Sequence, residues 1–408
     1  MMFANIGNYS FFAYTYSGAK LPAAVNAVFS TGRLLLALFP LVIILSGRFK
    51  ALGLKASIFL NWDILLLSSV GLASCIMVNN PIEVFTYVAW MLGLTMVVIF
   101  WITKQSELSL ENKLLELAKV FTHSHFIVLI LLSLKIADSR SLNFEMAYSS
   151  KNFYAYALYV LIFGIVLFVY LKNTLNERRI RIFYFVKTSY LMIFTSIALS
   201  VYFIMISGRR SALIASGLVL MTLISLTGGR SWKNLIFIFA ALILLFTTPI
   251  TLDGFLTIDR LKVLSFSEGQ ISEQHHSNSL GERLEIWSTY YTVFKSYPVF
   301  GVGPGNAQHT QAIMFPNSPV SGYSPHNSYL AVLVEYGVVG SILLFIVFVR
   351  NLYYISLMRH GPRLLYGSFS IGLLIICLFE YNSSPGQILF IPILISLIWP
   401  RFSIGKKN

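Results

Sequence analysis

The sequence predicts an all-α integral membrane protein with about 11–12 transmembrane helices and one large polar loop that contains short helices. Three observations lead to this fold class: 56% of the 408 residues are hydrophobic, only 11% are charged, and the mean hydropathy is +0.73. Soluble globular proteins carry about 25% charged residues. The deficit extends along almost the whole chain, so water is not the main solvent of this protein.

Apolar segments of about 20 residues have the length that crosses a bilayer as a helix. Eleven such segments are expected, at residues 24–46, 56–78, 83–103, 115–137, 152–171, 182–206, 211–227, 233–249, 329–349, 364–382 and 385–400. Residues 1–20 are short and polar for a twelfth span. Backbone N–H and C=O groups in lipid must form their hydrogen bonds within their own segment, so the spans are expected to be helices. Their unbroken hydrophobicity excludes a membrane barrel, whose strands alternate apolar and polar residues.

The net charge of +14 does not indicate nucleic-acid binding, because the basic residues lie at the ends of apolar segments and are not clustered on one solvated face. Of the 30 basic residues, 19 fall in loops on one side of the membrane, ten on the other, and Arg33 lies inside the first span. Cytoplasmic loops carry the excess of Lys and Arg, so the side with 19 is predicted to be cytoplasmic. The long polar loop and the turn at 207–210 then share the outer face.

The predicted organisation has three parts. Residues 1–250 form an N-terminal transmembrane bundle of about eight spans, residues 251–328 form a polar loop subdomain, and residues 329–408 hold the last transmembrane helices and a cytoplasmic tail. Loops as long as 251–328 are uncommon unless they have a function. We therefore expect the chemistry of the protein in this loop.

Short helices are expected inside the loop. Leu284, Trp287 and Tyr291 share one face of a helical pattern that stops at Pro298. Gly301–Gly305 follows as a tight turn. Its Gly-x-Gly-x-Gly spacing also occurs in phosphate-binding turns, but no strand precedes it here, so the spacing gives little support for that role.

Three candidate sites fall on the outer face: the Arg209-Arg210 pair at a span boundary, Arg283 at the start of the loop helix, and His326-Asn327 at the foot of the returning span. Arginine binds phosphate oxygens in a bidentate fashion, so converging arginines would hold a lipid-linked diphosphate. Histidine exchanges a proton readily near neutral pH, so His326 could accept one from an attacking hydroxyl. Arginines can stabilise a departing diphosphate without a metal, and we expect neither a metal nor a cofactor.

Each of these residues also has a structural interpretation. Arg209 and Arg210 stand at a helix end, where arginines often anchor the helix at the lipid headgroups. Arg283, followed by Glu285, is also typical of a solvated helix face, and a histidine between Pro and Asn is often structural. Arg33 lies near the middle of a span, where a charge is costly unless it faces a cavity or a partner, and it is a further candidate for substrate binding.

Residues 281–340 combine these features in a particular order. The segments read Arg283-Leu284-Glu285-Ile286-Trp287, Pro298-Val299-Phe300-Gly301-Val302-Gly303, His326-Asn327-Ser328-Tyr329-Leu330 and Glu335-Tyr336-Gly337-Val338-Val339-Gly340. An outer turn upstream reads Ser207-Gly208-Arg209-Arg210-Ser211-Ala212. Together these segments resemble the signature region of the O-antigen ligase and polysaccharide polymerase superfamily.

The resemblance implies an all-helical, metal-independent, inverting glycosyltransferase. Such a protein takes a glycan from undecaprenyl diphosphate on the periplasmic side of the bacterial inner membrane. The resemblance also implies residue roles: Arg210 and Arg283 would hold the diphosphate, with Arg209 as the alternative to Arg210. His326 would activate the acceptor hydroxyl, and Asn327 would fix the turn that carries it.

The acceptor stays open between two possibilities. A ligase of lipopolysaccharide biosynthesis moves the glycan to the lipid A core, whereas a polymerase moves it onto a second lipid-linked repeat. We favour the ligase because the family signature is typified by ligases. Besides the donor and acceptor, the expected partners are membrane lipids and a regulator of glycan chain length; nucleic acid is not expected.

A non-enzymatic transporter of a lipid-linked glycan is an interpretation from another class. The many spans, Arg33 at membrane depth and the outer arginines favour it. Transporters are often built from paired halves with interrupted helices at matching positions, and no such pairing is evident in this sequence. A transporter should tolerate replacement of His326, whereas the enzyme should not.

Overall fold

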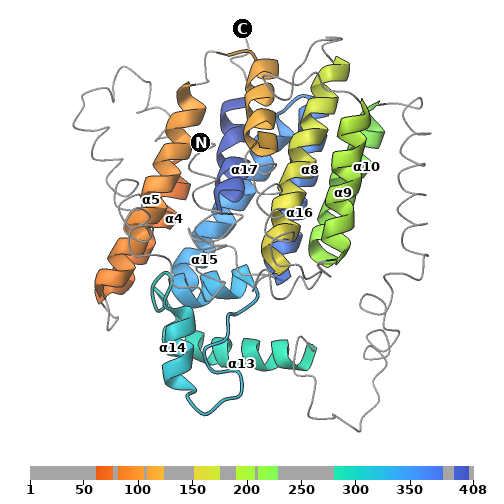
Figure 1. Cartoon of the computed structure of the whole chain (residues 1–408). Helices are drawn as coiled ribbons and strands as arrows, with labels where there is room; N and C mark the ends of the chain where they lie inside the picture. The colour runs from red at the N-terminus through yellow and green to blue at the C-terminus, as the bar shows by residue number, and fades with distance from the viewer. Residues whose placement is uncertain are drawn as a thin grey trace, which may run out of the picture.

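The computed structural model describes residues 61–76, 81–104, 108–123, 151–174, 190–206, 210–227, 280–379 and 390–403 (Figure 1). Every regular element in these ranges is a helix, and no strand occurs among them. The all-α class is therefore confirmed for the described part of the chain. The span expected at 24–46, the one at 233–249, and residues 1–20 lie outside the described ranges.

Most of the described helices belong to one bundle. Its members are α4 (Trp62–Val70), η1 (Gly71–Ile76), α5 (Pro81–Lys104), residues 110–123, α8 (Lys151–Thr174), α9 (Tyr190–Ile206), α10 (Arg210–Thr227), α15 (Ser328–Ser356), α16 (His360–Phe379) and α17 (Phe390–Ser403). Helix α10 packs between α8 and α16, while α17 packs between α5 and α15. In Figure 1 the axes of the long helices of the bundle are roughly aligned, while successive helices such as α8 and α9 run in opposite directions.

The expected spans coincide with helices wherever the structure describes them. Within the described ranges, α15 and α16 are long and apolar enough to cross a membrane. The remaining bundle helices contain shorter apolar stretches, such as Tyr87–Thr103 and Ala155–Leu171. The total of 11–12 spans therefore stays a prediction.

Helix α15 is apolar on its outward face as well as on its inward face. Ile342, Phe345, Val349 and Leu352 are exposed at helical spacing, and Phe345 is 67% exposed. Val347 lies between them in sequence and is buried. A helix that is hydrophobic all round belongs in a core or a membrane. Because no described element covers the outward ridge, we expect lipid to cover it.

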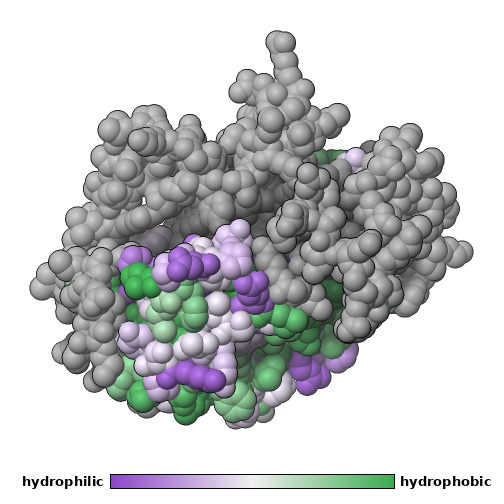
Figure 2. Space-filling view, turned by 90° about the horizontal axis from the view of Figure 1, so that it is seen from below, coloured by the Kyte–Doolittle hydropathy of each residue, from purple (hydrophilic) through white to green (hydrophobic). Residues whose placement is uncertain are grey.

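A smaller unit lies at one end of the bundle, built from α13 (Leu280–Ser296), α14 (Ala307–Met314) and their connections. It has its own apolar core, whose buried residues are Ile286, Tyr290, Val293, Val302, Ala307, Val320 and Val334. Figure 2, seen from this end, shows hydrophilic and hydrophobic residues interspersed over the described surface. Residues 251–279 lie outside the described ranges, so the three-part domain division stays a prediction.

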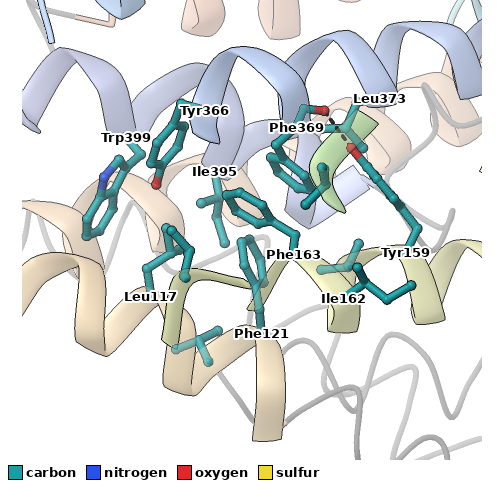
Figure 3. Packing of buried hydrophobic residues seen from close by; sticks show 14 of the residues in the cluster. Leu117, Phe121, Tyr159, Ile162, Phe163, Tyr366, Phe369, Leu373, Ile395 and Trp399 are labelled. Atoms are coloured by element: carbon teal, nitrogen blue, oxygen red, sulfur yellow. Dashed lines mark hydrogen bonds between the residues drawn. The ribbon is translucent and has the colours of Figure 1, made fainter. Parts of the chain in front are cut away.

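The core of the bundle is aromatic where α8 meets α16 (Figure 3). The rings of Phe163 and Phe369 stack with centroids 3.9 Å apart, and Phe121 packs against both. The Tyr159 hydroxyl donates a hydrogen bond to the carbonyl oxygen of Phe369 over 2.7 Å. Stacked rings add about 0.5–1.5 kcal/mol beyond the burial of their area. This contact therefore fixes α16, the helix beside which α15 begins.

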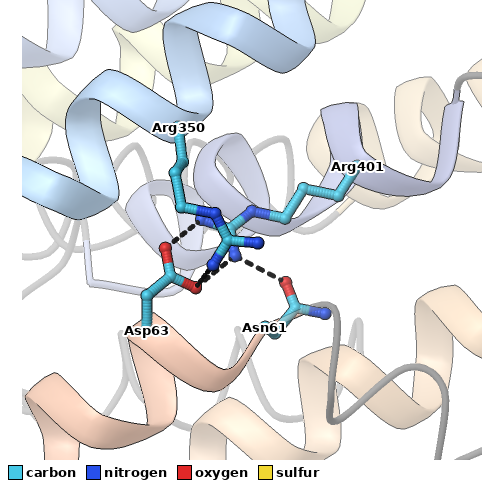
Figure 4. Close-up of polar contacts among 4 residues, drawn as sticks. All are labelled: Asn61, Asp63, Arg350 and Arg401. Atoms are coloured by element: carbon cyan, nitrogen blue, oxygen red, sulfur yellow. Dashed lines mark hydrogen bonds and ion pairs between the residues drawn. The ribbon is translucent and has the colours of Figure 1, made fainter.

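A buried ion cluster ties three helices together at the end of the bundle away from α13 and α14 (Figure 4). The Asp63 carboxylate, on α4, accepts bidentate hydrogen bonds of 2.6 and 2.8 Å from Arg401 on α17. Arg350 on α15 lies 2.8 Å from the same carboxylate. The Lys113 amine donates to the carbonyl oxygen of Phe402 nearby.

These three basic residues belong to the set of 19 that the charge count places on one side of the membrane. Arg283 belongs to the opposite set and lies on α13, at the other end of the bundle. These three residues of one set and Arg283 of the other thus lie at opposite ends of the bundle. Which end is cytoplasmic stays a prediction.

Candidate functional site

Helix α15 is broken one-third of the way along its length. Gly337 has φ 63° and ψ −163°, which is not a helical conformation. A break inside a helix leaves carbonyl and N–H groups without intrahelical partners, and these groups must be satisfied elsewhere. Segment 298–303, which follows α13, supplies the partners.

Four backbone hydrogen bonds join this segment to the break. The N–H groups of Val338 and Val339 donate to Pro298 (2.8 Å) and Val299 (3.2 Å), and those of Val302 and Gly303 donate to Val334 (2.9 Å) and Glu335 (2.9 Å). Two separate stretches of the signature, 298–303 and 335–340, therefore form one interlocked unit. We call this unit the Gly301–Gly337 interlock.

The two glycines are required by close backbone contact. A Cβ atom built on Gly301 would lie 2.4 Å from the carbonyl carbon of Glu335, and one on Gly337 would lie 2.3 Å from the carbonyl oxygen of Val299. Both residues also have positive φ. The N–H groups of Val302 and Gly303 are engaged by α15, so this turn has a structural role and its glycines do not form a phosphate-binding cradle with those groups.

The turn before α15 carries His326. Asn327 is the N-cap of α15, and its side-chain oxygen accepts hydrogen bonds of 3.0 Å from the N–H groups of Tyr329 and Leu330. His326 has φ 45° and is the one non-glycine residue with a positive φ in the described ranges. The left-handed region is uncommon for non-glycine residues, and such conformations cluster at functional sites. His326 itself is half-buried.

Helix α13 connects Arg283 to this turn. Arg283 lies in its first turn and is half-buried, and Trp287 follows one helical turn later on the same face. The indole Nε1–H of Trp287 donates a 2.9 Å hydrogen bond to the carbonyl oxygen of Pro325. The residue next to His326 is thereby held by the helix face that also presents Arg283.

The N-terminus of α10 lies at the same end of the bundle as this turn. The Tyr329 hydroxyl, in the first turn of α15, donates to the carbonyl oxygen of Leu374 on α16 over 3.2 Å. A Cβ atom on the neighbouring Gly372 would lie 3.0 Å from the Cβ of Ala215 on α10. Arg210 is the first residue of α10, about 8 Å along the axis from Ala215.

Arg210 thus begins its helix at the level where the His326 turn enters the bundle, although the placement of its side chain is outside what the structure describes. Arg209 and Arg33 also lie outside the described ranges. The structure therefore places three predicted site elements, the N-terminus of α10, helix α13 and the His326 turn, at the same end of the bundle. Within the described ranges, no group of three or more His, Cys, Asp or Glu side chains could hold a metal ion.

A buried glutamine supports the site and has no signal in the sequence. Gln311 on α14 is fully buried; its amide donates to Thr289 Oγ1 and to the carbonyl oxygen of Val320, each over 3.1 Å, and its oxygen accepts from the N–H of Gly322 over 2.7 Å. These bonds join α14, α13 and the loop that leads to His326. Polar partners this far apart in sequence cannot be predicted from local pattern.

Comparison with known proteins adds one finding at the level of the family. The sequence model of the O-antigen ligase family matches residues 195–345. The matched range includes α10, α13, α14, the His326 turn and the Gly301–Gly337 interlock. No curated protein matches the chain. The resemblance predicted from the signature segments is confirmed over this range.

Proposed function

We propose that this chain, whose residues 195–345 match the sequence model of the O-antigen ligase family, is a metal-independent inverting glycosyltransferase. It transfers a glycan from undecaprenyl diphosphate to an acceptor hydroxyl at the periplasmic face of the bacterial inner membrane. The observation that carries this proposal is the His326 turn. A strained histidine, set between the α15 N-cap Asn327 and a Pro325 carbonyl that the Arg283-bearing helix contacts, is the arrangement expected of a positioned base.

The reaction is a single displacement at the anomeric carbon. The acceptor hydroxyl oxygen forms the new bond to that carbon, while the bond from the carbon to the diphosphate oxygen breaks and its electron pair leaves with undecaprenyl diphosphate. The hydroxyl proton passes to His326. Attack from the side opposite the leaving group inverts the anomeric configuration.

The leaving group develops negative charge in the transition state, and arginines suit that charge. Arg283 lies in the first turn of α13, half-buried beside the Trp287 contact to the His326 turn. Arg210, or Arg209 beside it, would supply the second guanidinium at the start of α10. Positioned cations that stabilise developing charge often contribute the largest part of catalysis. Arg33, if it faces the same site, would contact the lipid-proximal part of the donor.

The acceptor we favour is the sugar of the lipid A core, because the family model that matches is described as O-antigen ligase. The chain would then complete lipopolysaccharide at the outer face of the inner membrane. A polymerase that uses a second lipid-linked repeat would need the same donor contacts and the same base. The test below separates the two by product.

The test is a transfer assay with the purified protein in detergent and EDTA. The donor is an undecaprenyl-diphosphate glycan, offered with lipid A core or with a second lipid-linked repeat. His326→Ala and Arg283→Ala are compared with His309→Ala, an exposed histidine on α14, and Arg359→Ala, an exposed arginine near the opposite end of the bundle.

A single shifted core band, lost in the first two variants and kept in the controls, would support the ligase. A ladder on the lipid-linked repeat with the same variant pattern would support a polymerase with the same site and overturn the ligase. If product forms but no variant differs from wild type, the roles of His326 and Arg283 are wrong; if no product forms with either acceptor, the enzyme proposal fails. Retained transport of the lipid-linked glycan in His326→Ala would then favour the transporter.

A further inference from the structure

Two side chains on one face of α13 hold the backbone of the His326 turn. The Trp287 indole N–H donates to the carbonyl oxygen of Pro325 over 2.9 Å, and the Tyr290 hydroxyl donates to the carbonyl oxygen of Tyr323 over 2.7 Å. The two donors are three residues apart, so they lie on the same side of the helix. They contact the turn one and three residues before His326.

The conformation of His326 needs such support. A non-glycine residue in the left-handed region costs roughly 1–2 kcal/mol, and strain of this kind persists only where the surroundings impose it. Pro325 has a fixed φ and no N–H, and it restricts the residue before it. The backbone carbonyl groups of Pro325 and Tyr323 are therefore the main hydrogen-bonding groups through which the protein can fix this turn.

Tyr290 is suited to holding the turn because its side chain is fixed in place and its hydroxyl always carries the proton of the hydrogen bond. It is fully buried in the core of the α13–α14 unit, between Ile286 and Val293 in the helix sequence. Burial, and secondarily the negative charge of Glu335, raises the pKa of the Tyr290 hydroxyl well above its ordinary value. The hydroxyl therefore keeps its proton, and the bond to Tyr323 persists at any pH at which the protein functions.

Trp287 is suited for a related reason. The indole N–H can only donate, so a partly buried tryptophan is satisfied by one acceptor in one direction. Trp287 lies one turn after Arg283, so the same rigid helix carries the diphosphate contact and the contact to Pro325. A shift of α13 would move both together.

We infer that Trp287 and Tyr290 are positioning residues, which fix the direction of the His326 imidazole relative to Arg283 by clamping the carbonyl groups at 325 and 323. This inference rests on the proposed function of His326 as the base. It assigns two residues that would touch neither donor nor acceptor. Their loss should lower the rate of the chemical step and leave donor binding unchanged.

The test uses Trp287→Phe and Tyr290→Phe, singly and together, because each removes one donor and keeps an aromatic ring. Tyr291→Phe is the matched control: it lies next to Tyr290 but its side chain is half exposed. We expect kcat to fall about 10-fold in each single variant and about 100-fold in the double variant, since a misplacement of about 1 Å can cost 10²-fold. The KM for the lipid-linked donor should stay within about two-fold of wild type, because the donor contacts are unchanged.

A second readout does not depend on activity. Site-resolved mass spectrometry after brief treatment with diethyl pyrocarbonate reports how accessible each histidine is. The modification rate at His326 should rise several-fold in the double variant and stay constant at His309, the internal control on α14. A purely structural role would instead lower the yield of folded protein.

The two readouts separate the inference from the proposed function. A lower kcat with a constant donor KM and a faster reaction at His326 alone would support the clamp. If wild type is active and the double variant keeps its kcat, the clamp is wrong while the enzyme proposal stands. If wild type is inactive, the enzyme proposal fails, and an unchanged His326 reaction rate in the double variant would overturn the clamp as well.

Discussion

Gly301 and Gly337 lie backbone to backbone at the break in α15: a Cβ atom built on Gly337 would lie 2.7 Å from the backbone nitrogen of Gly301. The contact places the loop after α13 inside the path of α15, a helix long and apolar enough to cross a membrane. The short helical segment from Ser328 to Tyr336, which directly follows the His326 turn, is therefore held by the same unit that carries Arg283. This close contact explains why Gly301 and Gly337, and not larger residues, occupy these two positions.

The first prediction concerns this interlock. Gly337→Ala should lower the stability of the protein strongly, because the new methyl group would overlap the carbonyl of Val299 and the residue would keep a positive φ. Overpacking of this kind typically costs about 1–3 kcal/mol, and the left-handed backbone adds roughly 1 kcal/mol or more. The measurement is the midpoint of thermal unfolding in detergent, followed by size-exclusion chromatography.

Gly367→Ala on α16 is the matched control, because nothing lies within 4 Å of a Cβ atom at that position. Alanine is a better helix former than glycine, so this variant should be neutral or slightly more stable. Equal midpoints for Gly337→Ala and Gly367→Ala would show that the interlock does not stabilise the fold.

The second prediction separates strain from chemistry at His326. His326→Gly and His326→Ala both remove the imidazole, so both should abolish transfer. They should differ in stability, because glycine adopts φ 45° without the penalty that alanine incurs, and His326→Gly should be more stable than His326→Ala by about 1 kcal/mol. Thermal unfolding of both variants in the same detergent checks the difference, and transfer by either variant would remove the histidine from the mechanism.

The helical class of this protein could be predicted from sequence because lipid leaves a backbone few alternatives to the helix. The expected spans at 83–103 and 152–171 fall within α5 and α8, whose ends lie only a few residues beyond them. The break at Gly337 could not be predicted in the same way. It lies inside an apolar run, and its stability depends on partners more than 30 residues away, at 298–303.

The candidate site was predictable in part for a similar reason. His326 and Arg283 stand out because polar residues of those types in a short outer segment have few purely local roles. Trp287, by contrast, reads as an ordinary apolar residue of an amphipathic helix. Its hydrogen bond to Pro325 spans 38 residues and becomes visible only when the loop is folded. The same is true of Gln311, whose partners come from α13 and from the loop after α14.

The third prediction concerns the cap of α15. Asn327→Ala removes the acceptor for two N–H groups of the first turn, so it should cost about 1 kcal/mol of stability and lower activity by loosening the His326 turn. Asn327→Asp and Asn327→Ser keep a capping oxygen, so these variants should retain most of the stability and most of the activity. Stability and kcat are measured together in the three variants. If Asn327→Asp is as inactive as Asn327→Ala, the side chain has a role other than capping.

The fourth prediction concerns the ion cluster at the opposite end of the bundle. Asp63 is fully buried and is the carboxylate that contacts Arg401, also fully buried, and Arg350, which is 24% exposed. Asp63→Asn keeps the shape of the side chain but leaves two guanidinium groups without this counter-charge. Removing one partner of a buried ion pair typically costs about 3–5 kcal/mol, so the variant should unfold at a markedly lower temperature than wild type.

The stability lost in Asp63→Asn should depend on how deeply the ion pair is buried and on the guanidinium charges that remain. Glu116→Gln breaks the 2.6 Å pair with Lys119, which is partly exposed, and surface pairs contribute at most about 1 kcal/mol, so this control should stay near wild type. Adding Arg401→Met to Asp63→Asn removes one of the two guanidinium charges that contact Asp63 in the wild type, and should recover part of the lost stability. An Asp63→Asn variant as stable as Glu116→Gln, or a double variant less stable than Asp63→Asn alone, would mean that the arginines are compensated elsewhere and that Asp63 does not hold α4, α15 and α17 together.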